Sequence, residues 1–336
     1  MRFVRDLEAL PKGHLHLHLE GSMRPATLAD LAAEHGLEVP ATRGYGNFGA
    51  FAGLYRAACA VIVRPDDLRR VVGEVVEDAA LDGAWWVEPS FHVPHQRNVV
   101  ADDHELVELV LDAARDAATR LGIGVGLILT ADRTAPVEQA VELAQLAAEY
   151  AGRGVVGFGL ANDESTHPPE PFGPAFDIAR AAGLLSIPHA GELAGPESVR
   201  ASLDRLGADR LQHGVRAVEE PALTARLAAD DICCDVCPTS NLMLSVCASL
   251  AEHPLPALLD AGVPCSLNAD DSLLFGAGLL DEYRLARDEV GLDDPQLASI
   301  AWSSLRCSAA PTEVQQRARA AIDVWLSSPG GSPGPG

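Results

Sequence analysis

Eight short apolar runs recur along the chain, and each is followed by a segment with helical periodicity. This alternation limits the possible folds more than any other feature, because strand–helix–strand repeats build parallel sheets whose crossovers are helices. The runs lie at residues 14–20, 84–91, 125–131, 155–161, 184–191, 210–215, 232–238 and 264–270. Eight such units within 336 residues favour one closed (β/α)8 barrel of the TIM type over two doubly wound domains.

Two stretches exceed what the eight units need. Residues 24–82 are longer than one crossover helix, so we expect extra helices after the first strand that can cover the barrel mouth as a lid. Helical segments after residue 277 are expected to pack outside the barrel. A single domain is therefore predicted over residues 1–326. Residues 327–336 have the composition of a disordered tail, with the sequence SSPGGSPGPG.

The charge balance excludes several classes of partner. Asp and Glu number 48 against 25 Lys and Arg, which gives a formal net charge of −23. Such a surface repels nucleic-acid phosphates and anionic lipid head groups, so a small molecule is the expected partner. No apolar run approaches the roughly 20 residues of a membrane span. Charges interrupt the N-terminal segment before a signal-peptide core could form, which predicts a cytoplasmic protein.

Cysteine usage agrees with a reducing compartment. The chain has seven cysteines, an odd number without regular spacing. Cys233, Cys234 and Cys237 form a cluster with one C-x-x-C spacing, as in some zinc and redox sites. The surrounding ICCDVCP is typical of a buried strand, and cysteine is among the most buried residue types, so we interpret the cluster as core.

Polar residues gather at the ends of the predicted strands, where barrel enzymes carry their reactive groups. In the first run, His14, His16, His18 and Glu20 are spaced by two, so an extended chain projects all four to one face. The other polar residues end three later runs: His189 and Glu192, then His213, then Asn268, Asp270 and Asp271.

Taken singly, each of these groups has an ordinary explanation, such as a surface histidine pair or an aspartate that caps a helix. Their convergence around one barrel axis predicts a metal site instead. Imidazoles with one carboxylate favour zinc over Ca²⁺ or Mg²⁺, and a coordination position left open for water makes such a site catalytic. Two-metal barrel hydrolases use a bridging lysine on the fourth strand, which residues 155–161 lack. One zinc per chain is therefore predicted.

Six segments in order resemble motifs of the adenosine/adenine deaminase family of the amidohydrolase superfamily, with most similarity to bacterial adenosine deaminases. They are PKGHLHLHLEGSMRP, VVGFGLANDE, PHAGE, LQHG, CPTSN and SLNADD, between Leu10 and Pro311. The resemblance implies four zinc ligands, namely His16, His18, His189 and Asp270. It also implies that Glu192 protonates N1 of a 6-aminopurine, while His213 and Asp271 orient and deprotonate the water that attacks C6.

The expected substrate contacts depart from the family pattern. Asn162 stands where these deaminases commonly have a glycine whose N–H meets purine N3, and His18 and Asp271 are further expected contacts. Glu20 stands where many adenosine deaminases have Asp. In an extended strand it would point into the mouth and meet ribose hydroxyls, which favours a nucleoside; an ion pair with Arg24 would suit adenine equally well. His14 lies outside the pair of histidines, His16 and His18, to which the resemblance assigns zinc binding, and it is interpreted as structural.

The predicted reaction is hydrolysis of adenosine or 2′-deoxyadenosine to the 6-oxopurine and ammonia, with adenine or a larger nucleoside such as aminofutalosine as the next candidates. HLEG, THPPEPF and HGVRAVE resemble adenine deaminases, whereas ANDE and SLNADD resemble adenosine deaminases.

Three other classes of protein were considered. The zinc signature of cytosine deaminases is matched literally by His18-Leu19-Glu20 and by the spacing of Cys234 and Cys237. No proline precedes Cys234, however, and that interpretation leaves His189 without a role. A catalytically inactive binding barrel would also fit the strand pattern, as would a metal-dependent hydrolase of amides or esters.

Overall fold

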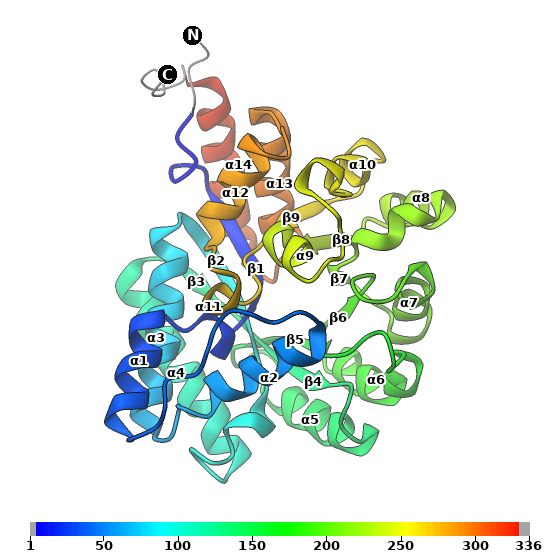
Figure 1. The fold of residues 1–336 in the computed structure, drawn as a ribbon. Coiled ribbons are helices and arrows are strands. Elements are labelled where there is room, and N and C mark those ends of the chain that lie inside the picture. Colours follow the sequence, from blue (N-terminus) through cyan, green and yellow to red (C-terminus); the bar gives the residue numbers. More distant parts are fainter. Residues whose placement is uncertain (1–4, 329–336) are drawn as a thin grey trace.

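The computed structural model describes residues 5–328, and its centre is a ring of parallel strands (Figure 1). The strands are β1 (Lys12–His18), β2 (Ala84–Phe91), β3 (Gly124–Val125), β4 (Leu127–Asp132), β5 (Val155–Ala161), β6 (Leu185–Ala190), β7 (Arg210–His213), β8 (Cys233–Val236) and β9 (Cys265–Leu267). Their order is β1-β2-β4-β5-β6-β7-β8-β9, with β3 paired to β2. Past the end of β9, His18 N donates to Asp270 O at 3.0 Å and Asp270 N donates to His16 O at 3.1 Å. These bonds close the sheet, so the predicted (β/α)8 barrel is confirmed.

The third predicted run is divided into two strands. Gly126 separates β3 from β4, and Trp86 of β2 fills the space beside these glycines. A Cβ on Gly124 would lie 2.3 Å from the Trp86 ring, and one on Gly126 would lie 3.1 Å from it. The indole therefore occupies the volume that side chains would need, and the strand resumes as β4 only past Gly126.

Helices surround the barrel. They are α1 (Pro25–Glu34), α2 (Phe48–Cys59), α3 (Pro65–Leu81), α4 (Asp103–Leu121), α5 (Val137–Glu149), α6 (Gly173–Ala181), α7 (Pro196–Ala201), α8 (Pro221–Ala229), α9 (Pro238–Met243), α10 (Leu255–Asp260), α11 (Ser272–Phe275), α12 (Leu279–Asp288), α13 (Asp294–Arg306) and α14 (Thr312–Ser327). Helix α4 shows how local sequence sets their bounds. The Asp102 side chain accepts a hydrogen bond from Glu105 N at its start, and Gly122 ends it with φ 73°.

The helices between β1 and β2 confirm the predicted insertion after the first strand. Of these, α2 lies across the open end of the barrel (Figure 1). It is fixed there by a small apolar cluster in which the rings of Phe51 and Phe275 stack at 5.2 Å. Because Phe275 belongs to α11, directly after the last strand, the lid is tied to the barrel at the same edge as the predicted site.

The C-terminal helices also follow the prediction, since α13 packs against β1 and β9 from outside. Helix α14 extends to Ser327, one residue into the predicted tail. The rest of that tail, from residue 329 on, lies outside the described residues. Within residues 5–328, no helix is long and apolar enough to cross a membrane.

A buried ion-pair network lies within the barrel beneath the strand ends. Arg210 bonds Glu88 at 2.7 Å and Asp235 at 2.6 Å. Ser266 Oγ donates to Asp235 and accepts from Asn268, whose Oδ1 accepts from the main chain of β1, at 2.7 Å from Leu15 N. One guanidinium thus serves two carboxylates, and Ser266 Oγ and Trp86 Nε1 donate to the other oxygen of Asp235 and of Glu88, respectively. The network therefore connects four strands, β2, β7, β8 and β9, to the segment that carries the first histidines.

The cysteine cluster is part of the core, as interpreted from the sequence. Cys233, Cys234 and Cys237 are fully buried and form no disulfide. Cys237 nevertheless lies closer to the predicted site than the core interpretation requires, because its Sγ is 3.3 Å from Nδ1 of His16.

Candidate active site and metal centre

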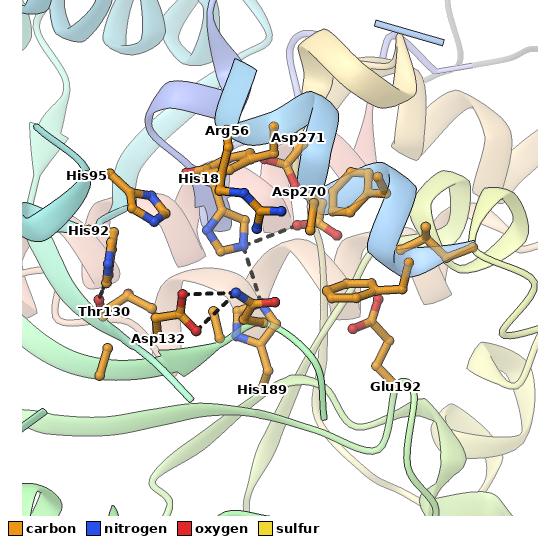
Figure 2. A pocket seen from close by; sticks show the side chains of 18 of the residues that line it. His18, Arg56, His92, His95, Thr130, Asp132, His189, Glu192, Asp270 and Asp271 are labelled. Carbon is orange, nitrogen blue, oxygen red and sulfur yellow. Dashed lines mark hydrogen bonds and ion pairs between the residues drawn. The ribbon is translucent and has the colours of Figure 1, made fainter. Parts of the chain in front are cut away.

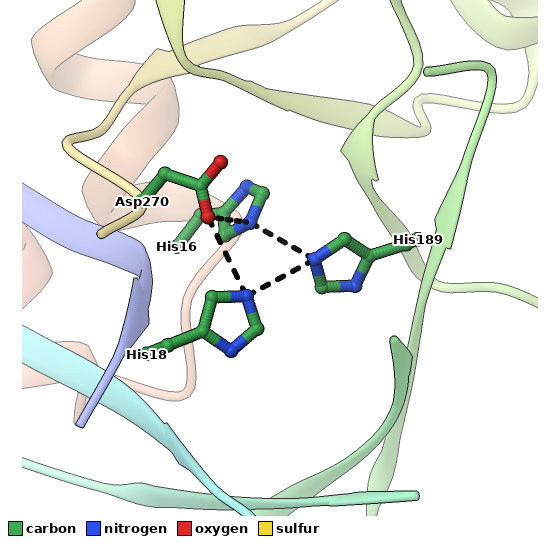
Figure 3. A group of neighbouring side chains, drawn as sticks. All are labelled: His16, His18, His189 and Asp270. Carbon is green, nitrogen blue, oxygen red and sulfur yellow. Dashed lines mark hydrogen bonds and ion pairs between the residues drawn. The ribbon is translucent and has the colours of Figure 1, made fainter. Parts of the chain in front are cut away.

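Four side chains converge at the open end of the barrel (Figure 3). His16 and His18 come from β1, His189 from β6 and Asp270 from the turn after β9. The Nε2 atom of His189 lies 3.2 Å from Nε2 of His16 and 3.3 Å from Nε2 of His18. Asp270 Oδ1 lies 3.4 Å from each of the latter two nitrogens. The structure thus brings together all four residues predicted as metal ligands, with one donor atom of each facing the others.

Backbone carbonyls orient two of the rings. His16 Nδ1 donates to Asp235 O at 3.1 Å, and His189 Nδ1 donates to Leu160 O at 3.0 Å. A ring that holds its proton on Nδ1 presents the Nε2 lone pair, and metal-binding histidines are typically oriented in this way. The Nε2 lone pairs of His16 and His189 face each other at 3.2 Å, an unfavourable arrangement unless a cation lies between them. The donor set therefore fits a metal ion.

Electrostatics support the same interpretation. Burial lowers the pKa of His18 to about 4 and holds that of His189 well below its usual value, so both rings are neutral. Burial also acts to lower the pKa of His16, but the neighbouring Asp270 reverses the shift and raises it. Burial alone would raise the pKa of Asp270, yet His16 and the other imidazoles hold it well below the usual range. A carboxylate beside two neutral imidazoles is ready to bind a cation, and a cation would replace the proton that Asp270 favours on His16.

Three further predicted residues adjoin this cluster. His213 is the last residue of β7, and its Nε2 lies 3.4 Å from Glu192 Oε1 and 3.9 Å from Asp270 Oδ2. Asn241 Nδ2 donates to Nδ1 of His213 at 3.2 Å, which leaves the proton of the neutral ring on Nε2. His213 can therefore donate a hydrogen bond to an oxygen at the centre of the site.

The two remaining carboxyl groups differ electrostatically from Asp270. Burial, reinforced by Asp270 and Glu164, raises the pKa of Glu192 well above its usual value. Burial and the adjacent Asp270 do the same to the pKa of Asp271. Oδ1 of Asp271 is buried and has no hydrogen-bond partner among the described residues. A site with carboxyl groups of opposite pKa shifts is suited to move protons at neutral pH.

A cavity of about 720 Å³, its open mouth included, contains these groups and extends past them. Figure 2 shows Glu192 at one end, His18 and His189 in the middle, and His92 and His95 at the other end. The lid helix contributes Phe48, Phe51, Tyr55 and Arg56 to the wall. The wall combines aromatic and polar side chains, as is typical of cavities that bind small molecules.

Comparison with known proteins identifies the family. The model of the family described as "Adenosine deaminase" matches residues 11–325. The chain belongs to the adenosine deaminase family. It is thus a hydrolase that acts on carbon–nitrogen bonds of amidines, a deaminase of aminopurines. The membership inferred from the six motifs is confirmed.

Relatives of the deaminase carry several substrate names. A Streptomyces coelicolor protein provisionally named adenosine/adenine deaminase is 44% identical, over 97% of this chain and 99% of its own length. Two others from that organism are an aminodeoxyfutalosine deaminase, 34% identical over 96% and 88%, and an adenine deaminase, 33% identical over 95% and 96%. These relatives establish the reaction class and leave the substrate open.

Solved structures agree in fold, and one of them contains zinc. Adenine deaminase from Arthrobacter aurescens superposes with a TM-score of 0.89 at 29% identity, covering 95% of this chain and 100% of that chain. An amidohydrolase from Burkholderia ambifaria with bound zinc has a TM-score of 0.88 at 28% identity, covering 96% and 93%. Enzymes of this superfamily depend on metals, and the deaminase has a donor set that fits one.

Two buried residues support the deaminase site although the sequence assigned them no role. The carboxylate of Glu164 accepts hydrogen bonds from four consecutive backbone N–H groups at 191–194, over 2.6 to 3.0 Å. Arg133 Nη2 donates to His189 O at 2.6 Å. Together they fix the loop that carries His189 and Glu192. The acidic residue of the ANDE segment was the available signal for Glu164.

Three site residues adopt a left-handed backbone: Asn162 with φ 83°, His213 with φ 69° and Asp270 with φ 57°. Non-glycine residues rarely adopt this conformation, and it concentrates at functional sites. Asn162 therefore adopts a conformation that glycine favours, at the position where the family pattern has a glycine. Its Nδ2 donates to both carboxylate oxygens of Asp132, at 3.0 and 2.9 Å, which stabilises that geometry.

Glu20 does not lie where the period-two alternation predicts. Strand β1 ends at His18, and Leu19 turns the chain with helical φ −53° and ψ −52°. The Glu20 carboxylate is consequently buried beside the cavity and not in its wall, where it accepts from Tyr55 Oη at 3.1 Å and Gln96 Nε2 at 3.3 Å. Burial raises its pKa to about 7. The carboxylate therefore has no exposed surface in the cavity at which a ribose hydroxyl could meet it.

The ion pair suggested between Glu20 and Arg24 is also corrected, because Arg24 bonds Asp78 and Glu77 instead. His14 lies buried, and its Nε2 accepts from Ala269 N at 3.2 Å. It supports the turn that leads to Asp270, in agreement with the structural interpretation.

Proposed function

We propose that the deaminase binds one zinc ion through His16, His18, His189 and Asp270 and converts adenosine or 2′-deoxyadenosine to the 6-oxopurine nucleoside and ammonia. The observation that carries the substrate assignment is the shape of the cavity, which continues beyond the metal ligands to a second polar end. Zinc supplies Lewis acidity, which lowers the pKa of a water molecule to about 7.

The residues of the chain provide the proton transfers. Glu192 holds a proton near neutral pH because it is buried beside Asp270, and it donates this proton to N1 of the purine. Protonation at N1 makes C6 electrophilic. His213 orients the attacking water through Nε2–H, and Asp271, with a free Oδ1, accepts its proton. Asp271 does so as a carboxylate, a form that the positive charge of a bound zinc ion would favour against its raised pKa in the metal-free site. The proton then passes to the amino group, which leaves as ammonia, and the hydroxyl proton on C6 returns to Glu192, which gives the 6-oxopurine.

The purine ring itself relates the two ends of the cavity. N1 and C6 lie on one edge of the six-membered ring, and N9 lies on the opposite side. A purine with N1 at Glu192 therefore directs its N9 substituent away from Glu192, toward the end lined by His92 and His95. A nucleoside fills that end with its sugar, whereas free adenine leaves its polar groups without partners, which costs transition-state binding.

Two further substrates have specific support. Adenine is favoured by the adenine deaminase relatives and by the burial of Glu20, which removes one expected ribose contact. A larger nucleoside such as aminofutalosine is favoured by the aminodeoxyfutalosine deaminase relative and by the aromatic lid residues Phe48 and Phe51.

Ammonia release from adenosine, 2′-deoxyadenosine, adenine and aminofutalosine by the purified enzyme tests the assignment. We expect kcat/KM for adenosine to exceed that for adenine by ~10²-fold or more, because buried polar groups left unpaired discriminate strongly. A higher kcat/KM for adenine would assign the free base instead. No ammonia from any 6-aminopurine would overturn the proposed function.

A further inference from the structure

The CPTSN motif is the one of the six motifs to which the proposed reaction assigns no residue. Its last residue, Asn241, lies on α9 and is fully buried. The Asn241 side chain lies between two histidines, because its Nδ2 is 3.2 Å from Nδ1 of His213 and its Oδ1 is 3.2 Å from Nε2 of His253. His253 is also buried, in the turn before α10, and does not line the cavity. The three side chains form a hydrogen-bonded chain that leads from the core to the active site.

Backbone hydrogen bonds hold both ends of the loop that joins α9 to α10. The carbonyl of Asn241 accepts from Val246 N at 2.8 Å and from Cys247 N at 3.3 Å, so the loop folds back onto α9. At the other end, His253 N donates to Leu250 O at 3.2 Å. The loop therefore presents the His253 ring to Asn241 from a fixed backbone.

The position of the proton on His253 is determined by the first residue of α10. Leu255 N donates to Nδ1 of His253 at 3.1 Å. An N–H group in the first turn of a helix has no partner within the helix and can only donate, so Nδ1 of His253 must be unprotonated. A second ring proton would have to lie on Nδ1, opposite this N–H group, so the ring is neutral and carries its proton on Nε2. Burial acts in the same direction, because it lowers the pKa of His253 to about 4.

The orientation of the Asn241 amide follows from this proton. Since Nε2 of His253 donates, the Asn241 atom that faces it must be the acceptor, Oδ1. The reverse orientation would place the donor Nδ2 against Nε2, and His253 would then accept at both nitrogens, as an imidazolate anion in the core. The Nδ2 group is thereby directed to Nδ1 of His213, which can only accept. The proton of His213 is left on Nε2, 3.4 Å from Glu192 Oε1.

We propose that His253 is a positioning residue, which holds the Asn241 amide in one orientation and so fixes the proton of His213 on Nε2. The inference rests on the proposed function, in which this N–H group orients the attacking water. With the amide reversed, His213 would carry its proton on Nδ1 and present a lone pair to the water and to the carboxyl groups of Glu192 and Asp270. It could then no longer donate a hydrogen bond at the centre of the site.

Nitrogen-15 NMR of the zinc-loaded enzyme with labelled histidines tests the proton positions directly, because protonated and unprotonated imidazole nitrogens have well-separated chemical shifts. The two rings are assigned by the loss of their signals in His213→Gln and in His253→Gln. We expect a proton on Nε2 and none on Nδ1 in both rings of the parent enzyme. A proton on Nδ1 of either ring would overturn the inference, whether or not any other variant folds.

His253→Phe keeps a ring of similar size but removes its N–H group. We expect kcat for adenosine to fall by ~10-fold or more while KM and zinc content stay near the parent values, because only the orientation of the water is lost. A signal from Nδ1–H should appear on His213 in this variant. His253→Gln retains an N–H donor for Asn241 and should keep kcat within a few-fold of the parent value. An unchanged kcat in His253→Phe, or an equal loss in His253→Gln, would contradict the role as a donor.

A double-mutant cycle tests whether His253 acts through Asn241. Asn241→Leu removes both hydrogen bonds of the amide at nearly constant volume and should lower kcat by itself. His253→Phe should then cost nothing further in the Asn241→Leu background, because contacting residues in one network are not additive. Additive losses would assign His253 a different route to the site and overturn the inference.

His35→Phe is the matched control for the loss of a hydrogen-bonded histidine. His35 Nε2 bonds Asp67 at 2.7 Å, and the residue does not line the cavity, so kcat should stay at the parent value even where stability falls. A fall in kcat equal to that of His253→Phe would show a general effect of destabilisation and contradict the inference. The proposed function fails separately, because it requires ammonia release from a 6-aminopurine, whereas the NMR experiment measures proton positions without turnover.

Discussion

The two ends of the cavity are built differently. At the end of the proposed metal site, which we call the metal end, the four candidate ligands lie at or just past the ends of barrel strands, are largely buried, and two rings are oriented by the carbonyls of Asp235 and Leu160. At the opposite end, which we call the outer end, His92 and His95 lie on a short turn, and Nδ1 of His95 has no hydrogen-bond partner within residues 5–328. The metal end is thus organised before a substrate binds, whereas the outer end has hydrogen-bonding capacity that the protein leaves unused.

This difference separates chemistry from specificity. Preorganised polar groups lower the barrier for every substrate that reaches them. Groups that become paired only when a ligand binds discriminate between substrates. Changes at the metal end should therefore affect all 6-aminopurines alike, and changes at the outer end should alter the order of substrates.

The largest effect is expected for His189→Ala, which removes one ligand from the centre of the cluster. Metal affinity should fall, and kcat/KM should drop by ~10³-fold or more for all substrates, since the Lewis acid contributes several kcal/mol. Elemental analysis and ammonia-release kinetics measure both. Full metal retention with activity near that of the parent would remove His189 from the ligand set.

Glu192→Gln should separate proton transfer from metal binding. The amide is nearly isosteric but has no acidic proton, so kcat should fall by ~10²-fold or more while zinc content stays constant. The loss should be similar for adenosine and adenine, because both present N1. A kcat within a few-fold of the parent value would show that another group donates the proton.

Gly21→Ala tests how closely the first turn approaches the proton acceptor. A Cβ at Gly21 would lie 1.6 Å from Asp271 Oδ1, so the carboxylate must move. Misplacement of a reacting group by about 1 Å lowers rates by up to ~10²-fold, and we expect kcat to fall by at least ~10-fold with zinc retained. An unchanged kcat would mean that Asp271 does not act from its present position.

A pair of variants at Asn162 probes the wall between the two ends. Asn162→Ala places a residue without side-chain hydrogen bonds at φ 83°, and the free energy of unfolding should fall by about 1–2 kcal/mol. Asn162→Gly tolerates that conformation and should be destabilised less. Chemical denaturation measures both variants. Equal stability losses would show that the bonds to Asp132, and not the backbone conformation, determine the cost.

The strands and the convergence of polar residues at their ends could be predicted because both follow short-range rules, and the family resemblance then selected the four candidate ligands. Period-two alternation placed His16 and His18 on one face, and the parallel strand order brought His189 and Asp270 to the same end. The same rule misplaced Glu20, because the strand ends at His18 and the next residue is helical. Alternation says nothing about where a strand stops.

The residues on the lid side of the cavity have no comparable signal in the sequence. Arg56 lies on the lid helix α2, and His92 and His95 lie on a short turn after β2; they line one cavity only because α2 crosses the barrel mouth. Glu164 presents the same difficulty, because its role depends on four backbone N–H groups about 30 residues away. Contacts between loops that are far apart in the sequence depend on tertiary packing, and the periodicity of hydrophobic residues within one element does not predict them.

The central claim is that one zinc ion, held by three histidines and Asp270, is required for deamination. Stepwise addition of zinc to metal-free enzyme, with metal content and ammonia release from adenosine measured at each step, tests it most directly. We predict that activity rises linearly with zinc and reaches its plateau at one zinc ion per chain. A plateau at two zinc ions per chain, or full activity without metal, would contradict the account.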